Sequence, residues 1–168
     1  MTFVMIRQMR KMLGQLDKWL EAATTYAQGK SFDPQNFLSL RLAPDQFGFA
    51  KQVQTACDTA KLAAARMAGR EAPKHADTEQ TMSDLRARVA DVVAYLDGFT
   101  EADFAAGATR VITQPRWEGK VMSGADYFLE HAVPNFFFHL THAYAILRHN
   151  GVSLGKRDYL GPLSQHLP

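Results

Sequence analysis

The sequence predicts an all-α protein, a four-helix bundle with a short hairpin or extended loop before the last helix. Four segments carry apolar residues at steps of three and four, which places one apolar seam on each helix. The segment before the last helix loses this period, and no internal repeat is visible. Four seams of this kind can be buried only against one another, so residues 1–168 are predicted to form a single domain.

The first helix is predicted over about residues 3–27, because Met5, Met9 and Met12 share its apolar seam and Gly29 follows its last turn. Methionine side chains at this spacing fill a core or form an adaptable contact between two copies of a chain. We therefore expect core packing here, together with a homodimer. An irregular connection with two prolines follows the helix.

The second helix is predicted from Pro44 to about Met67, since proline is tolerated in a first helical turn. Its seam is narrow and rich in alanine, and Cys57 beside it is expected to be buried and inert. Gln52 and Asp58 flank this seam. They either face a neighbouring helix or lie in solvent, and the sequence leaves both alternatives open.

The third helix is predicted from Thr78 to Asp97, with a regular apolar step that ends before a glycine. From residue 99 to residue 122 the helical period is lost. Two short runs of alternating residues flank Pro115 in this segment. They indicate a short β-hairpin or an extended loop that lies against the bundle.

The last helix is predicted to run from Ser123 to Gly151, with a bend at Pro134 because proline removes one backbone hydrogen bond. The residues after Gly151 have no helical period and are expected to form an irregular tail. The positions that recur on the apolar face of this helix are Leu129, Ala132, Val133, Phe136, Leu140, Ala143, Tyr144 and Leu147.

Composition excludes several classes of function. The chain is 46% hydrophobic and 21% charged, which is typical of a soluble globular protein, and no apolar run approaches the roughly 20 residues of a membrane span. The net charge is +2 with basic residues spread along the chain, so nucleic acid is not an expected partner. One cysteine and no recognisable secretion signal predict a cytoplasmic protein.

A stripe of polar residues runs beside the apolar face of the last helix, at His131, Asn135, His139, His142 and His149. His139 and His142 are three residues apart, so both imidazoles can reach one ion. A carboxylate or a third histidine from a facing helix would complete a zinc, nickel or iron site, and Asp58 suits that role better than Gln52. Alternatively, these histidines are hydrogen-bonded core residues, and His149 is a helix-end residue.

Two segments resemble a family of bacterial domains of unknown function in the DinB/YfiT-like superfamily. They are LAPDQFGFAKQVQTACDTAK and PNFFFHLTHAYAILRHNGVSLGKRDYLG. The resemblance covers nearly the whole chain and implies a four-helix bundle, often dimeric. Many members of the superfamily hold a divalent metal with three histidines, one on the second helix and two spaced by four on the last. Some use that metal to activate a low-molecular-weight thiol in transferase or isomerase reactions.

Matched to this sequence, the superfamily pattern places the two last-helix ligands at Asn135 and His139 and the second-helix ligand near Gln52. Only one of the three is a histidine. Amide oxygens bind zinc or nickel poorly compared with imidazole. Either His142 and Asp58 have become ligands, or the site is a polar pocket.

Two hypotheses follow from these residues. The first is a divalent-metal-dependent enzyme of the thiol-dependent transferase type, holding zinc or nickel with an altered ligand set of His139, His142 and Asp58. In it, His142 is a ligand or a general base, and Gln52 and Asn135 contact the bound group. The second is a non-catalytic small-molecule-binding or homodimeric interaction protein that binds no metal.

Overall fold

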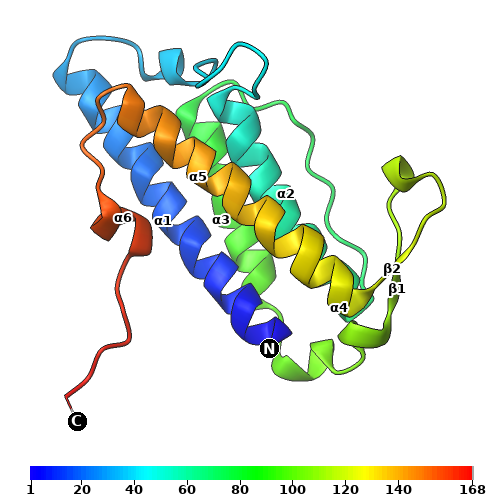
Figure 1. The fold of residues 1–168 in the computed structure, drawn as a ribbon. Coiled ribbons are helices and arrows are strands. Elements are labelled where there is room, and N and C mark those ends of the chain that lie inside the picture. The colour runs from blue at the N-terminus through cyan, green and yellow to red at the C-terminus, as the bar shows by residue number, and fades with distance from the viewer. Residues whose placement is uncertain (168) are drawn as a thin grey trace.

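The computed structural model describes residues 1–167 and shows an all-α four-helix bundle, as predicted (Figure 1). The long helices are α1 (Thr2–Gly29), α2 (Phe49–Ala68), α3 (Met82–Asp97) and α5 (Val133–His149). Shorter elements are β1 (Val111–Ile112), β2 (Met122–Ser123), α4 (Gly124–Asp126) and α6 (Lys156–Leu160). Single turns of 3-10 helix occupy Pro34–Phe37, Glu101–Phe104, Gly107–Thr109 and Pro115–Trp117. Within the described residues, no helix is long and apolar enough to cross a bilayer.

Helices α2 and α3 run in the same direction, which requires a long connection between them. Lys51 at the start of α2 pairs with Asp77 just before α3, and Arg70 just after α2 pairs with Asp103 just after α3. The connection, residues 69–81, therefore returns along the length of the bundle (Figure 1). We refer to it as the crossover segment.

The pairs α1–α3 and α2–α5 are antiparallel, whereas α1 and α5 run in the same direction, because Trp19 lies on Tyr144 and Tyr26 lies on Gly151. Helix α1 lies against α3, where Arg10 bonds Asp97 and Asp17 bonds Arg86. Helix α2 lies against α5 in the most extensive helix pairing of the bundle, and α5 places the histidine stripe beside α2. Contacts of this kind between long amphipathic helices bury one apolar face of each.

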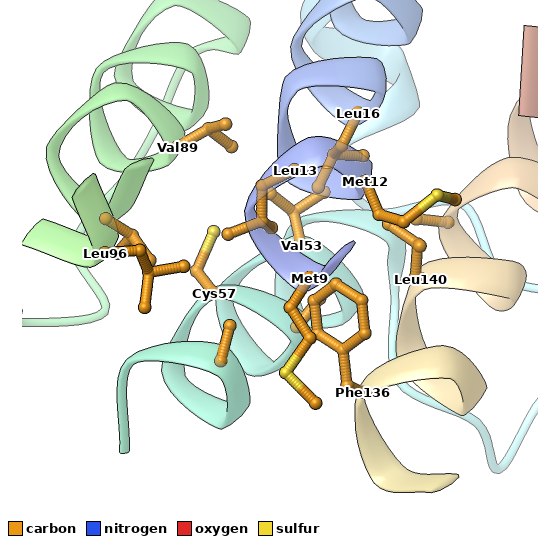
Figure 2. Packing of buried hydrophobic residues seen from close by; sticks show 14 of the residues in the cluster. Met9, Met12, Leu13, Leu16, Val53, Cys57, Val89, Leu96, Phe136 and Leu140 are labelled. Atoms are coloured by element: carbon orange, nitrogen blue, oxygen red, sulfur yellow. The ribbon is translucent and has the colours of Figure 1, made fainter. Parts of the chain in front are cut away.

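The core is built from the apolar seams that the sequence predicts. Met9 and Met12 of α1, Val53 of α2, and Phe136 and Leu140 of α5 are all fully buried or nearly so (Figure 2). The methionines are therefore core-filling residues, which was one of the two expected roles. Homodimerisation stays a prediction, since the structure contains one chain and these side chains are used inside it.

The second helix begins later than predicted, at Phe49 rather than at Pro44. Gly48 is extended, and the Phe49 and Ala50 amides donate to the carbonyl oxygens of Leu40 and Leu38 at 2.8 Å and 3.0 Å. The irregular connection thus satisfies amides that a helix start leaves without partners.

The third helix also begins later than predicted, at Met82 instead of Thr78. Thr81 and Asp84 form a capping box, in which each side chain accepts a hydrogen bond from the other residue's backbone amide. The residues from 78 to 81 therefore belong to the crossover segment. This places Glu79 beside α3 without making it helical.

The last helix is interrupted rather than uniform. A π-helical turn, Tyr127–Ala132, separates α4 from α5, and Pro134 lies in the first turn of α5. Proline has no amide to donate, so the hydrogen-bond pattern changes next to it. The wider turn rotates Leu129 out of the apolar face. Leu129 is 72% exposed, so the prediction that it lies on the apolar face is wrong.

The segment before the last helix forms the predicted hairpin. Strands β1 and β2 are antiparallel, with Val111 opposite Ser123 and Ile112 opposite Met122. The second strand lies later than the alternating run around Trp117 indicated. The tail was predicted to be irregular, but it contains α6, which packs on α1 where the Trp19 indole donates to the Asp158 carbonyl oxygen at 3.1 Å.

Candidate functional site

Polar side chains meet along the antiparallel contact of α2 and α5. We call Gln52, Thr59, Asn135 and His139 the α2–α5 polar layer. Two hydrogen bonds cross it: His139 Nδ1 to Gln52 Oε1 at 2.7 Å, and Asn135 Nδ2 to Thr59 Oγ1 at 2.7 Å. The polar pocket predicted from the sequence consists of Gln52, Asn135, His139 and His142, and the first three of these residues belong to this layer.

The hydrogen bonds of Gln52 determine which nitrogen of His139 carries the proton. The Gln52 amide nitrogen donates to the Phe47 carbonyl oxygen at 3.2 Å, so its Oε1 is the end that faces His139. An amide oxygen only accepts, and His139 Nδ1 must therefore carry the hydrogen. The other ring nitrogen, Nε2, is then an acceptor, and among residues 1–167 the hydrogen bond to Gln52 is the one that the His139 ring makes.

His139 is held in its neutral form. Burial lowers the pKa of His139 to about 4, with further lowering by electrostatic interactions with His142, Arg116 and Lys51. A ring with this pKa is uncharged at pH 7. It therefore accepts hydrogen bonds but is a weak base, far from the pKa near the operating pH that favours general-base catalysis.

Asn135 is oriented in the same way. Its amide nitrogen donates to Thr59, whose own hydroxyl donates to the Thr55 carbonyl oxygen at 2.7 Å. The Thr59 proton is thereby used, so the Thr59 oxygen must accept from Asn135. This leaves the Asn135 carbonyl oxygen free on the side away from α2.

A surface pocket of about 360 Å³ opens beside these two residues on the outer side of the last helix. Its lining residues are Glu130, His131, Pro134, Asn135, Phe138 and His139. We call it the His139 pocket. The Phe138 ring lies 5.2 Å from the His139 ring, and the Phe47 ring stacks on the same imidazole at 6.1 Å.

His131 borders the pocket but its polar atoms face elsewhere. Its Nε2 accepts a hydrogen bond from the Arg116 guanidinium, and its Nδ1 is buried without a hydrogen-bond partner. The ring stacks on Tyr127 at 5.6 Å. Burial lowers the pKa of His131, and the charges of Arg116 and Arg66 lower it further. His131 therefore acts as an uncharged wall of the pocket.

The structure does not bring His142 or Asp58 to His139 as a ligand set. His142 Nδ1 bonds the carbonyl oxygen of Phe138 on its own helix at 2.7 Å, and its Nε2 lies 3.4 Å from the Gln46 amide. Asp58 points toward α3, where it pairs with Lys61 at 2.7 Å and with Arg88 at 2.9 Å. Six positions along a helix turn Asp58 about 120° away from Gln52.

The residues at this site do not fit the metal that the superfamily implies. Gln52 Oε1 already accepts the His139 proton, and the Asn135 amide nitrogen is bonded to Thr59. Across residues 1–167, no group of three or more His, Cys, Asp or Glu side chains is arranged to hold an ion. One imidazole with two amides is a poor donor set for zinc or nickel.

Sequence reasoning missed two residues that define the site. Thr59 lies seven positions after Gln52, the same face of α2, and this spacing would have revealed it. Phe47 orients Gln52 through its backbone carbonyl oxygen, and no side-chain pattern reports such a contact.

The fold and the site define the class of the protein as a four-helix bundle, in which a crossover segment joins the parallel helices α2 and α3 and polar residues of α2 and α5 meet at one site. The model of the family described as "Domain of unknown function (DUF1993)" matches residues 1–160, and the chain belongs to this family. The resemblance found in the sequence is thereby confirmed.

A solved structure supports the same class. The chain is similar to a DinB family member protein from Shewanella denitrificans, whose crystal structure was determined at 1.83 Å. The two are 50% identical with a TM-score of 0.93, over 97% of this chain and 93% of the other. No curated protein matches the chain.

Proposed function

We propose that this DinB-like protein is a non-catalytic small-molecule-binding protein, which holds its ligand in the His139 pocket without a metal ion. The observation that carries the proposal is the buried hydrogen bond between His139 Nδ1 and Gln52 Oε1. It occupies the oxygen of Gln52 and leaves the His139 Nε2 acceptor facing away from α2. A pocket with a few oriented polar atoms beside aromatic rings is typical of small-molecule sites.

The alternative of a metal-dependent enzyme would require three rearrangements. Gln52 would release His139, His142 would break its bond to the Phe138 carbonyl oxygen, and Asp58 would leave two cations. The first two steps each remove a partner from a polar group, which costs about 1–3 kcal/mol, and the third breaks a buried ion pair, which costs about 3–5 kcal/mol.

Metal analysis tests the proposal directly. We expect purified protein to carry no stoichiometric divalent ion, and we expect its melting temperature to stay the same when zinc or nickel is added. The matched variants are His139→Ala and His149→Ala, since His149 is exposed on the same helix. A stoichiometric ion that is lost in His139→Ala and retained in His149→Ala would overturn the proposal.

Homodimerisation is a separate prediction that accompanies this function. Sedimentation equilibrium at micromolar concentration measures it. A mass of twice 18.8 kDa would support it, and a monomer would contradict it.

A further inference from the structure

We infer that the ligand of the His139 pocket is a neutral aromatic molecule that donates a hydrogen bond through a hydroxyl or ring N–H group. The inference rests on the proposed function and names its ligand class. It follows from the direction of the hydrogen bonds in the α2–α5 polar layer, the charges around the pocket and the aromatic rings beside it.

Two hydrogen-bond relays cross from α5 to backbone carbonyl oxygens, one at Thr55 in α2 and one at Phe47 just before it. The first runs from His139 through Gln52 to the Phe47 carbonyl oxygen. The second runs from Asn135 through Thr59 to the Thr55 carbonyl oxygen. A carbonyl oxygen has no proton, so neither relay can reverse without leaving an acceptor unpaired.

The consequence is that the relays present acceptors to the pocket. His139 Nε2 and Asn135 Oδ1 are the atoms that remain after the relays are formed. Glu130 adds a carboxylate, which also accepts. The nearby donor, His131 Nδ1, is sealed from solvent. A ligand that brings a donor satisfies these atoms, whereas one that brings only acceptors leaves them unpaired.

Charge argues against an ionic ligand. The positive charges of Arg116 and Lys51 are close enough to lower the pKa of His139, so they also oppose a bound cation. An anion would be attracted by these two charges, but it would meet the Glu130 carboxylate and two neutral acceptors in the pocket. A neutral ligand avoids both penalties.

The rings around His139 favour an aromatic body on that ligand. Phe138 is 54% exposed and Phe47 is 50% exposed, although both rings contact the buried His139. An aromatic ligand that bonds His139 Nε2 would cover the exposed Phe138 ring, which lines the pocket. Aromatic pairs of this kind add to the gain from apolar burial.

Four small probes test the ligand class by NMR titration of the full chain: phenol, anisole, benzoate and benzylammonium. Anisole has the ring and the oxygen of phenol but no donor. Because one hydrogen bond separates them, we expect phenol to bind about tenfold more tightly than anisole. Equal binding of phenol and anisole, tighter binding of either ion, or no binding of phenol at millimolar concentration would overturn the inference.

A variant that reverses one relay gives a sharper test. In Gln52→Glu, the carboxylate would favour the imidazolium form of His139, so that Nε2 becomes a donor. We expect the preference for phenol over anisole to disappear and benzoate to bind. Gln28→Glu, an exposed site on α1, makes the same change away from the pocket and should keep the preference for phenol.

If Gln52→Glu does not fold, Thr59→Val is the alternative test. It removes the hydroxyl that accepts from Asn135, so the Asn135 amide group can rotate. We expect it to weaken phenol several-fold, and an unchanged preference would overturn the role of the relays. The two proposals fail separately. A metal-free protein that binds benzoate or anisole but not phenol contradicts only the ligand class, whereas a stoichiometric ion contradicts the proposed function.

Discussion

Helix α2 buries polar side chains on two faces, and the two faces differ in charge. Toward α5, Gln52 and Thr59 make neutral hydrogen bonds. Toward α3, Arg88 pairs with Asp58, Asp77 and Glu79 at 2.8 to 2.9 Å, although its side chain is only 2% exposed.

The charged face, which we call the Arg88 cluster, includes one more buried cation. Lys61 is 4% exposed, and it contacts Asp58 at 2.7 Å and His75 Nδ1 at 2.9 Å. Asp77, Glu79 and His75 all belong to the crossover segment. The Arg88 cluster therefore attaches this segment to the bundle through charged and polar contacts.

This difference shows which face is available to a ligand. A buried ion pair becomes very unfavourable when one partner is removed, so the Arg88 cluster is a structural clamp. Neutral relays can leave one acceptor without a protein partner at a lower cost. The α2–α5 polar layer does this at His139 Nε2, and binding chemistry is expected there.

The largest expected effect comes from breaking the charged face. Arg88→Met leaves three acidic side chains without their shared partner, so we expect the free energy of unfolding to fall by about 4 kcal/mol. Urea denaturation measures it. Arg86→Met is the matched control, because the Arg86 pair with Asp17 is more than one-third exposed and contributes about 1 kcal/mol or less. Equal losses in the two variants would show that the Arg88 cluster is not a clamp.

The two faces of α2 should also contribute to the free energy of unfolding in different pH ranges. His139 binds a proton near its ordinary pKa of 6.5 when unfolded but only near a pKa of about 4 when folded. Between these values the unfolded state holds the extra proton. Stability should therefore fall as the pH falls from 6.5 toward 4, by up to about 3 kcal/mol.

The carboxylates of the Arg88 cluster respond at lower pH. Burial alone would raise the pKa of Asp77 and Glu79, but hydrogen bonds from Lys51, Arg88 and Gln54 more than offset it and lower both pKa values. Their contribution is present above their ordinary values of 3.8 and 4.5 and is lost below them.

Unfolding measured from pH 7 to pH 3 separates these windows. The pKa values of His75 and His131 are also lowered, so the contribution of His139 is the difference between the unchanged protein and His139→Gln. We expect His139→Gln to reduce the change in the free energy of unfolding between pH 6.5 and 4. The loss of stability at lower pH, which comes from the carboxylates of the Arg88 cluster, should stay the same. An identical slope in both proteins would contradict a buried neutral His139.

A smaller effect is expected when one neutral partner is removed. Gln52→Leu leaves His139 Nδ1–H buried without an acceptor, which should lower the free energy of unfolding by about 2 kcal/mol. Adding His139→Leu removes the unpaired group, so the double variant should recover part of that loss. If the losses simply add, the two side chains are not coupled.

The sequence predicts the bundle well because its apolar period is strong along each long helix. Met9, Val53 and Leu140 were assigned to the core by spacing alone, and all three are buried. The start of α2 could not be predicted in this way. It depends on amide contacts to the Leu38 and Leu40 carbonyl oxygens, which carry no side-chain signal.

The candidate site was predictable only in part. The resemblance to the superfamily placed Gln52, Asn135 and His139 together, and they do meet between α2 and α5. The proposal of Asp58 as a partner followed from its ligand chemistry and ignored its helix face. Its actual neighbours, Lys61 and Arg88, show that a carboxylate near a site in sequence can belong to another layer.

The smallest expected effect concerns how the crossover segment opens. His75 Nδ1 accepts from the Lys61 ammonium, and burial, then Lys61 and Arg88, lower the pKa of His75. Protonation of His75 at low pH would set its charge against these two cations, with Asp58 and Asp91 opposing that effect. Local opening should therefore become easier below the ordinary pKa of 6.5, by less than about 1 kcal/mol.

Hydrogen exchange of residues 70–80 at pH 7 and pH 5 measures this opening, after correction for the intrinsic effect of pH on exchange. His75→Gln keeps an acceptor for Lys61 but cannot be protonated, so the pH difference should disappear in it. The amides of α5 should not respond to this substitution, because the α2–α5 polar layer does not contact His75. A parallel response on both faces of α2 would mean that they open together, and the distinction between clamp and binding face would fail.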